Sequence, residues 1–151
     1  MTEEEQRAAV VAEAMTWLRT PYHHHGTIKG VGADCAMFPT EVYAACGLME
    51  RVDFGKYPTQ WHMHHNEERY LNIVLSVARE IEEIPGPGCF VLWKFGKAFS
   101  HGAIVVKWPT VIHCYMGQGV ILDDAERSGT FKYANGNLRE RRFFDLWGAR
   151  E

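Results

Sequence analysis

The first part of the chain carries apolar residues at spacings of three and four, which is typical of amphipathic helices. Thr2-Glu3-Glu4-Glu5 has the form of a capping box, so we expect a helix to begin there and to end near Thr20-Pro21. The inner stripe of this helix is predicted to contain Ala8, Val11, Met15 and Leu18. The chain therefore opens with a helix that packs by one face.

A second helical pattern covers residues 35–49. Its predicted inward positions are Phe38, Val42, Ala45 and Met49, and its outward positions are Thr40 and Glu41. Gly47 can end this helix, and Asp34 is suited to cap its beginning. Cys35 would then lie in the first turn, where unpaired N–H groups and the positive end of the helix dipole favour an anion.

The pattern changes at Pro85-Gly86-Pro87-Gly88, which is a strong break. Before the break, a third helix is predicted with a buried face of Tyr70, Ile73, Val74, Val77 and Ile81. After the break, the pattern predicts short strands at residues 89–95, 103–108, 111–115, 120–123 and 142–146. Helices followed by antiparallel strands indicate an α+β fold. With no repeat or linker, the chain is predicted to form a single domain over residues 1–151.

Composition narrows the class of protein. Hydrophobic residues make up 46% of the chain and charged residues 23%, as in an ordinary globular protein. The net charge of −3 offers no basic patch for nucleic acid, and no apolar run approaches the ~18 residues of a membrane span. Without a leading signal peptide, we expect cytoplasmic synthesis, with incorporation into a virion or delivery to the cell envelope afterwards, and four reduced cysteines.

Cys35, His101 and His113 are the candidate catalytic residues. A thiol attacks a carbonyl only as thiolate, so it needs a base. His101 is the candidate base, because the pKa of histidine suits both the uptake and the return of a proton. It stands at the edge of the apolar run Ala103–Val106, where a turn could aim it at a helix packed on the sheet. His113 is the candidate orienter, and a hairpin through Lys107-Trp108-Pro109-Thr110 would bring the two imidazoles side by side.

The start of the second helix also offers a place for the negative oxygen that forms when a thiolate attacks a carbonyl. The unpaired backbone N–H groups that favour the thiolate of Cys35 could donate to this oxyanion as well. A thiol, a base, an orienter and an oxyanion site together indicate a thiol hydrolase that cleaves an amide bond.

Five short motifs stand in order along residues 8–125: Pro21-Tyr22, Gly32-Ala33-Asp34-Cys35, Pro87-Gly88, Ser100-His101-Gly102-Ala103-Ile104-Val105 and Ile112-His113. This order resembles the NlpC/P60 family of cysteine peptidases. The resemblance implies a papain-like core, in which N-terminal helices pack on an antiparallel sheet, and a Cys-His-His triad. It also implies hydrolysis of peptidoglycan stem peptides, commonly at the γ-D-glutamyl–diaminopimelate bond, and it places the Tyr22 hydroxyl near the thiol and the oxyanion. The length and the absent export signal are similar to the phage-tail and gene-transfer-agent branch.

The chain departs from the family pattern near the thiol. Asp34-Cys35-Ala36-Met37 stands where the family has Asp-Cys-Ser-Gly, and His23-His24-His25-Gly26 replaces the Trp-Gly-Gly segment. Cys89 follows Pro87-Gly88 where the family has aspartate. Pro39 is unexpected inside a helical pattern, because it lacks a backbone N–H. These departures predict a remodelled substrate groove around an unchanged triad.

Two histidine clusters raise the question of a metal. They are His23-His24-His25 and His62, His64 and His65. Consecutive residues cannot all point to one ion, and the usual helical ligand spacing is absent, so we predict no metal site and no cofactor. A solvated loop is the simplest interpretation of the first cluster. We favour a substrate-binding rim in which His23, His24 and His25 lie with Tyr22 and Asp34.

Three hypotheses follow from the sequence. The first is a Cys-His-His amidohydrolase that acts on peptidoglycan stem peptides, with phage-tail-like proteins as further partners. The second keeps the fold but makes the chain an antibacterial effector amidase or an acyltransferase. The third is a non-catalytic tail component or metal-binding module. No nucleic acid and no membrane is expected as a partner.

Overall fold

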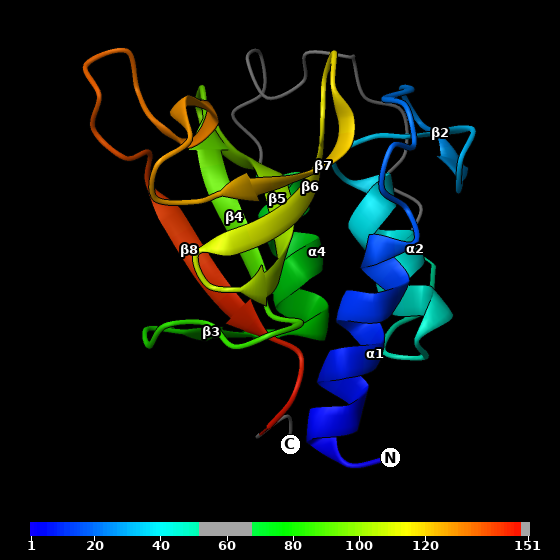
Figure 1. Cartoon of the computed structure of the whole chain (residues 1–151). Coiled ribbons are helices and arrows are strands. Elements are labelled where there is room, and N and C mark those ends of the chain that lie inside the picture. Colours follow the sequence, from blue (N-terminus) through cyan, green and yellow to red (C-terminus); the bar gives the residue numbers. More distant parts are fainter. Residues whose placement is uncertain (52–67, 149–151) are drawn as a thin grey trace.

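The computed structural model describes residues 1–51 and 68–148, and it has the predicted α+β architecture (Figure 1). Its helices are α1 (Glu3–Met15), α2 (Met37–Ala45) and α4 (Arg69–Val77). A six-stranded antiparallel sheet has the strand order β3-β8-β4-β5-β6-β7. The strands of this sheet are β3 (Arg79–Ile81), β4 (Phe90–Phe95), β5 (Ala98–Lys107), β6 (Thr110–Tyr115), β7 (Gly119–Asp124) and β8 (Arg141–Asp145). A separate two-stranded ladder pairs β1 (Thr27–Ile28) with β2 (Gly32–Ala33).

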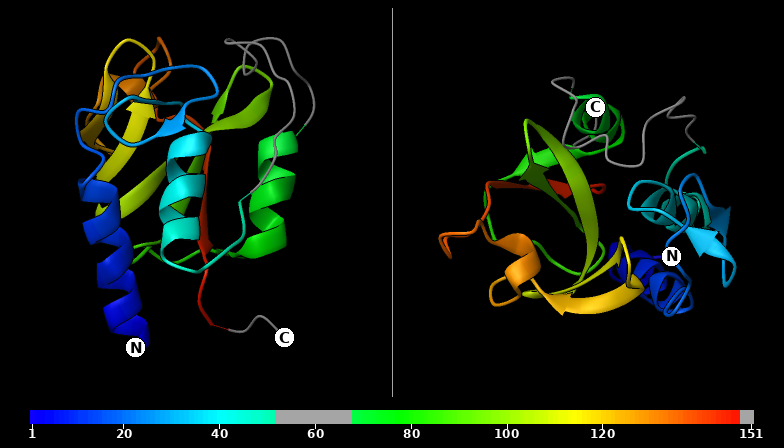
Figure 2. Two further views of the ribbon diagram at one scale, coloured as in Figure 1. Left: turned by 90° about the vertical axis from the view of Figure 1, so that its right-hand side faces the viewer. Right: turned by 90° about the horizontal axis from the view of Figure 1, so that it is seen from above.

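The three helices stand side by side against the sheet, with α2 in the middle (Figure 2, left). Seen from above, the sheet curves around the side that faces away from the helices (Figure 2, right). Even-numbered residues of the central strands, such as Leu92 and Ile104, join the core shared with the helices. Odd-numbered residues, such as Trp93 and Val105, pack inside the curve against Phe131. Because β4 and β5 are buried on both faces, their sequences are nearly continuous apolar runs. Within the described ranges, no helix is both long and apolar enough to cross a bilayer.

Helix α1 begins as predicted but ends early. The Thr2 side chain accepts from the Glu5 N–H and the Glu5 side chain accepts from the Thr2 N–H, which completes the capping box. The helix stops at Met15, because the chain turns to pair with β7: the Arg19 N–H donates to Val120 O at 3.0 Å. The predicted inner stripe of Ala8, Val11, Met15 and Leu18 is partly wrong: Met15 and Leu18 are half-buried and pack against the core, but Ala8 is exposed and Val11 is only half-buried. An apolar run of alanines and valines offers several possible faces, and contacts with α2 and the sheet select the one that carries Val10 and Ala14.

Helix α2 is shorter than the predicted 35–49. Gly47, with φ +73°, ends it as expected: the Leu48 N–H donates to Tyr43 O and the Gly47 N–H to Ala44 O. The predicted faces are partly wrong, because Thr40 is buried and Ala45 is exposed. A helix between two others is covered on most sides, and the Thr40 hydroxyl is satisfied by Ala36 O at 2.8 Å.

Pro39 is accommodated without a kink. It lies in the first turn of α2, where a backbone N–H has no partner within the helix.

The third helix also ends before its predicted limit. Ala78 is already extended, so Ile81 lies in β3 instead of on the buried face of α4. Tyr70, Leu71 and Val74 make that face. The histidines at positions 62, 64 and 65 lie outside the described residues.

An ionic cluster ties the first helix to the last strand. The Arg7 guanidinium donates to both carboxylate oxygens of Asp145 at 3.0 Å, and Arg79 donates to the same carboxylate at 3.2 Å. The Trp147 N–H donates to Asp145 Oδ1, and Arg7 also donates to Pro87 O. Asp145 therefore joins α1, β3, β8 and the segment before β4.

We expect Asp145→Ala to lower the free energy of unfolding by ~2–3 kcal/mol, because Arg7 would remain partly buried without its carboxylate. Urea denaturation measures the effect, with the exposed Glu83→Ala as the control. Equal midpoints for the two variants would show that the cluster adds nothing to stability.

Candidate active site

Cys35 lies in the tight turn that leads into α2. The helix begins at Met37, two residues later than predicted, and Ala36 is its N-cap. Asp34 nevertheless acts as the predicted cap, because its Oδ1 accepts from the N–H groups of Ala36 and Met37 at 3.0 and 2.8 Å. Its backbone carbonyl accepts from the Phe38 N–H at 3.0 Å. Asp34 therefore fixes the backbone on both sides of the thiol.

This capping corrects one expectation about the oxyanion. The sequence predicted that unpaired N–H groups at the helix start could bind it. The N–H groups of residues 36, 37 and 38 all donate to Asp34 instead. Capping by a side chain competes with ligand binding at a helix N-terminus, and here the cap is buried.

Asp34 also fastens the segment that carries the first histidine cluster. Its Oδ2 accepts from the His25 N–H at 2.9 Å. His25 has φ +64°, and its ring stacks on that of His24 at 4.0 Å between centroids. The His23 N–H donates to Ala33 O at 2.8 Å. These contacts hold His23, His24 and His25 beside the turn that bears Cys35.

Tyr22 is half-buried and bridges in parallel to Ala33, two residues from the thiol. Burial raises the pKa of its hydroxyl well above the ordinary value, and the negative charges of Cys35 and Asp34 raise it further. Tyr22 therefore stays a neutral hydroxyl at physiological pH and keeps a proton to donate.

The two candidate histidines meet as the hairpin predicted. His101 lies in β5 and His113 in β6, and His101 Nε2 is 2.7 Å from His113 Nδ1. Both rings are buried, with 6% and 0% of each residue exposed. One detail differs from the prediction: His101 lies inside a long strand, opposite Trp93 of β4, and not in a turn. Its backbone is held by the ladder, so the imidazole is fixed by the sheet.

A third strand adds a residue that the sequence analysis missed. Asp123 of β7 brings Oδ2 within 3.0 Å of His113 Nε2. Burial raises the pKa of this carboxyl, but hydrogen bonds from His113, the Asp124 N–H and Ser128 outweigh it, so the pKa lies below the ordinary value. The sequence contained a pattern from which Asp123 could have been found. The predicted strands 111–115 and 120–123 form a hairpin in which Val111 faces Asp123 and His113 faces Ile121. The two-residue period puts Asp123 and His113 on one face.

The thiol approaches strand β5 from the helix side. Cys35 Sγ lies 3.6 Å from Ser100 O, the carbonyl that immediately precedes His101. The Tyr70 hydroxyl of α4 donates to Cys35 O at 3.0 Å and holds the turn from the other side. The structure therefore brings Cys35 to the strand that carries His101.

Gly102 makes room for that contact. A Cβ at this position would lie 2.1 Å from Phe90 Cζ and 2.9 Å from the Tyr70 hydroxyl. The glycine after His101 is thus required by the helix face of β5, opposite to the imidazole.

Aromatic rings enclose the histidine pair. The His101 ring lies 5.3 Å from that of Phe95 and 5.5 Å from that of Tyr115, between centroids. The His113 ring lies 5.1 Å from that of Phe131, which is fully buried. Such surroundings keep water from the imidazoles and strengthen the hydrogen bonds between them.

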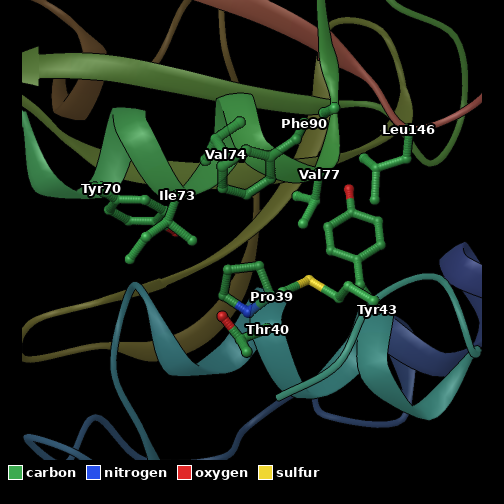
Figure 3. Close-up of a pocket in the computed structure, with 11 residues that line it drawn as sticks. Pro39, Thr40, Tyr43, Tyr70, Ile73, Val74, Val77, Phe90 and Leu146 are labelled. Carbon is green, nitrogen blue, oxygen red and sulfur yellow. The ribbon is translucent and has the colours of Figure 1, made fainter. Parts of the chain in front are cut away.

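An apolar pocket between α2 and α4 is separate from this cluster (Figure 3). Pro39, Tyr43, Tyr70, Val74 and Phe90 are among its lining residues. It offers about 30 Å³ of free space and almost no polar surface, so it cannot orient a peptide. Tyr70 links it to the thiol turn.

The three other cysteines have thiol pKa values that burial raises. All four are free, as expected. Burial raises the pKa of the Cys46 and Cys89 thiols, and it raises the pKa of Cys114 to about 12. Cys114 Sγ contacts Ala33 O at 3.2 Å on the face opposite to His113. Among residues 1–51 and 68–148, no group of three potential ligands is placed to hold a metal ion.

Comparisons with known proteins identify the fold. No family model matches the sequence, and no curated protein matches it. The NlpC/p60 domain of the peptidoglycan hydrolase SagA is 21% identical, with a TM-score of 0.60 over 90% of this chain and 96% of that one. RipD from Mycobacterium tuberculosis, a non-catalytic NlpC/p60 domain protein adapted to peptidoglycan binding, is 14% identical, with a TM-score of 0.55 over 94% and 98%. An NLP/P60 family protein from Staphylococcus aureus is 16% identical, with a TM-score of 0.59 over 93% of this chain and 42% of that one. The chain has an NlpC/P60-like fold.

We expect Asp34→Ala to lower the free energy of unfolding by ~2–3 kcal/mol, because three backbone N–H groups lose their acceptor. Asp34→Asn keeps one oxygen for Ala36 and Met37 but not the second oxygen for His25, so its effect should be about half as large. Urea denaturation of both variants measures the series. Equal losses for Ala and Asn would contradict the capping role.

Proposed function

We propose that this protein is a cysteine peptidase or amidase that hydrolyses an amide bond in peptidoglycan stem peptides. The observation that carries the proposal is the placement of Cys35 against Ser100, next to the hydrogen-bonded pair of His101 and His113. A thiol in the turn before a helix, a base on a strand and an orienter on the next strand form the arrangement that nucleophilic catalysis needs.

In this mechanism, His101 accepts the thiol proton of Cys35 through Nδ1, since its Nε2 is engaged by His113. The thiolate attacks the carbonyl carbon and pushes the π electrons onto oxygen. When the tetrahedral intermediate collapses, the C–N bond breaks and His101 returns the proton to the leaving amine. Water then attacks the thioester and gives its proton to His101. The second tetrahedral intermediate collapses, the C–S bond breaks, and the carboxylic acid product leaves. His101 then returns the proton to the Cys35 thiolate.

The oxyanion needs donors other than the helix N–H groups that Asp34 occupies. We assign this role to the Tyr22 hydroxyl and the Cys35 N–H. Tyr22 is suited to it because its raised pKa keeps the proton in place while negative charge develops nearby.

The substrate class follows from the fold and from the rim. SagA is a peptidoglycan hydrolase with a similar domain, and we propose the γ-D-glutamyl–diaminopimelate bond as the target. His23, His24 and His25 are held beside Cys35 by Asp34 and Ala33. Partly protonated imidazoles at this rim would attract the carboxylates of a stem peptide. None of the three solved structures is named as a phage-tail protein, so that assignment stays a prediction from the sequence.

RipD shows that this fold also serves non-catalytic peptidoglycan binding. Three features favour catalysis in the present chain: the thiol of Cys35, the imidazole pair of His101 and His113, and the carboxylate of Asp123 behind that pair. A binding module has no need of a buried pair of histidines on a strand that a thiol contacts.

Purified protein should release the two halves of stem peptides that contain a γ-D-glutamyl–diaminopimelate bond, as identified by mass spectrometry of muropeptide digests. Cys35→Ala should reduce the rate by roughly a thousandfold or more, because it removes the nucleophile. Cys46→Ala, at the other end of α2, is the matched control and should retain activity. An inactive wild-type protein, or an active Cys35→Ala variant, would overturn the proposal.

His101→Ala should impair hydrolysis more than His113→Ala, because the base carries the proton itself and the orienter only positions it. The double variant should be no slower than His101→Ala alone, since members of one catalytic unit are strongly non-additive. Steady-state kcat/KM of the three variants tests this. A double variant whose loss equals the product of the single losses would mean that the histidines act independently.

A further inference from the structure

Asp123 ends a chain of two hydrogen bonds that begins at His101. His101 Nε2 is 2.7 Å from His113 Nδ1, and His113 Nε2 is 3.0 Å from Asp123 Oδ2. We propose that Asp123 is a positioning residue that fixes the tautomers of both histidines, so that His101 presents an unprotonated Nδ1 to the thiol. The inference rests on the proposed thiol chemistry, but the tautomers can be measured without it.

The direction of these two hydrogen bonds follows from which atoms can donate a proton. A carboxylate only accepts, so His113 must carry its proton on Nε2 and donate to Asp123. A neutral imidazole has one N–H, which leaves His113 Nδ1 as an acceptor. His101 must therefore donate from Nε2. Its own Nδ1 then holds a lone pair, which is what a base needs.

This direction depends on Asp123 being ionised. Burial opposes ionisation, but hydrogen bonds from His113, the Asp124 N–H and Ser128 bring its pKa below the ordinary value. The Asp124 N–H donates to Oδ1 at 2.9 Å, so both carboxylate oxygens are engaged. The His113 side chain is fully buried and that of Asp123 is only 16% exposed, so water competes little for these bonds.

Without the carboxylate, the same two histidines could be bonded in reverse. His113 would accept at Nε2 and donate from Nδ1, and His101 would then carry its proton on Nδ1. In that tautomer His101 has no lone pair facing the thiol. The selected direction also suits the charged state, because imidazolium at His101 still donates from Nε2 to His113. The two hydrogen bonds therefore keep their direction when His101 takes the proton of Cys35.

The test uses protein labelled with ¹⁵N in its histidines. In the wild type at neutral pH and above, NMR should show both His101 and His113 as Nε2–H tautomers. Asp123→Asn offers an amide N–H to His113, so the reversed tautomers should appear, and alkylation of Cys35 by iodoacetamide should slow by at least about tenfold. Asp124→Asn removes an equal charge from the same strand, and its oxygen still accepts from the N–H groups of Glu126 and Arg127. It should change neither readout.

The inference is overturned if wild-type His101 carries its proton on Nδ1, a result that needs no variant to fold. It is also overturned if Asp123→Asn leaves both tautomers and the alkylation rate unchanged. A wild-type protein that shows the expected tautomers but cleaves no muropeptide would refute the proposed function and leave the role of Asp123 intact.

Discussion

The site depends on the two-residue period of antiparallel strands. Three neighbouring strands, β5, β6 and β7, each contribute an odd-numbered polar residue to the inside of the curved sheet: His101, His113 and Asp123. A slip of one residue in any of these pairings would turn that side chain toward the helices. The register of these strands is therefore as important for the hydrogen-bonded cluster as the identity of the residues. Apolar neighbours in both cores hold it in place.

The second constraint acts at the start of α2. The proposed mechanism requires a thiol from outside the curved sheet to meet residues that face its inside. Asp34 makes this possible, because it fixes the turn at Cys35, the helix start and the loop at His25 with three backbone hydrogen bonds. The same carboxylate occupies the helix N-terminus. In the proposed mechanism, stabilisation of the thiolate therefore falls mainly to the imidazole of His101, and less to the helix dipole.

The parts of the fold and of the candidate site that depend on local sequence patterns could be predicted. The capping box at Thr2, the end of α2 at Gly47 and the hairpin between His101 and His113 follow from short-range rules, and all three are confirmed. The buried faces of the helices were harder to predict, because α2 is covered on most sides and α1 is rich in alanine. Asp123 was missed because its role depends on a pairing between strands and not on spacing within one. The occupied N–H groups of α2 were missed because a cap and an anion site look alike in sequence.

Gly102 has a consequence for how such a sequence can vary. His101 and Gly102 are neighbours that face opposite sides of β5. On one side the imidazole of His101 contacts His113. On the other side Phe90 and Tyr70 leave no room for a side chain at position 102. A substitution at Gly102 would push on Tyr70, whose hydroxyl holds the carbonyl of Cys35. The residue allowed at position 102 thus depends on Tyr70, which lies on a separate helix. In divergent relatives that keep this geometry, we expect the glycine and the tyrosine to change together or not at all.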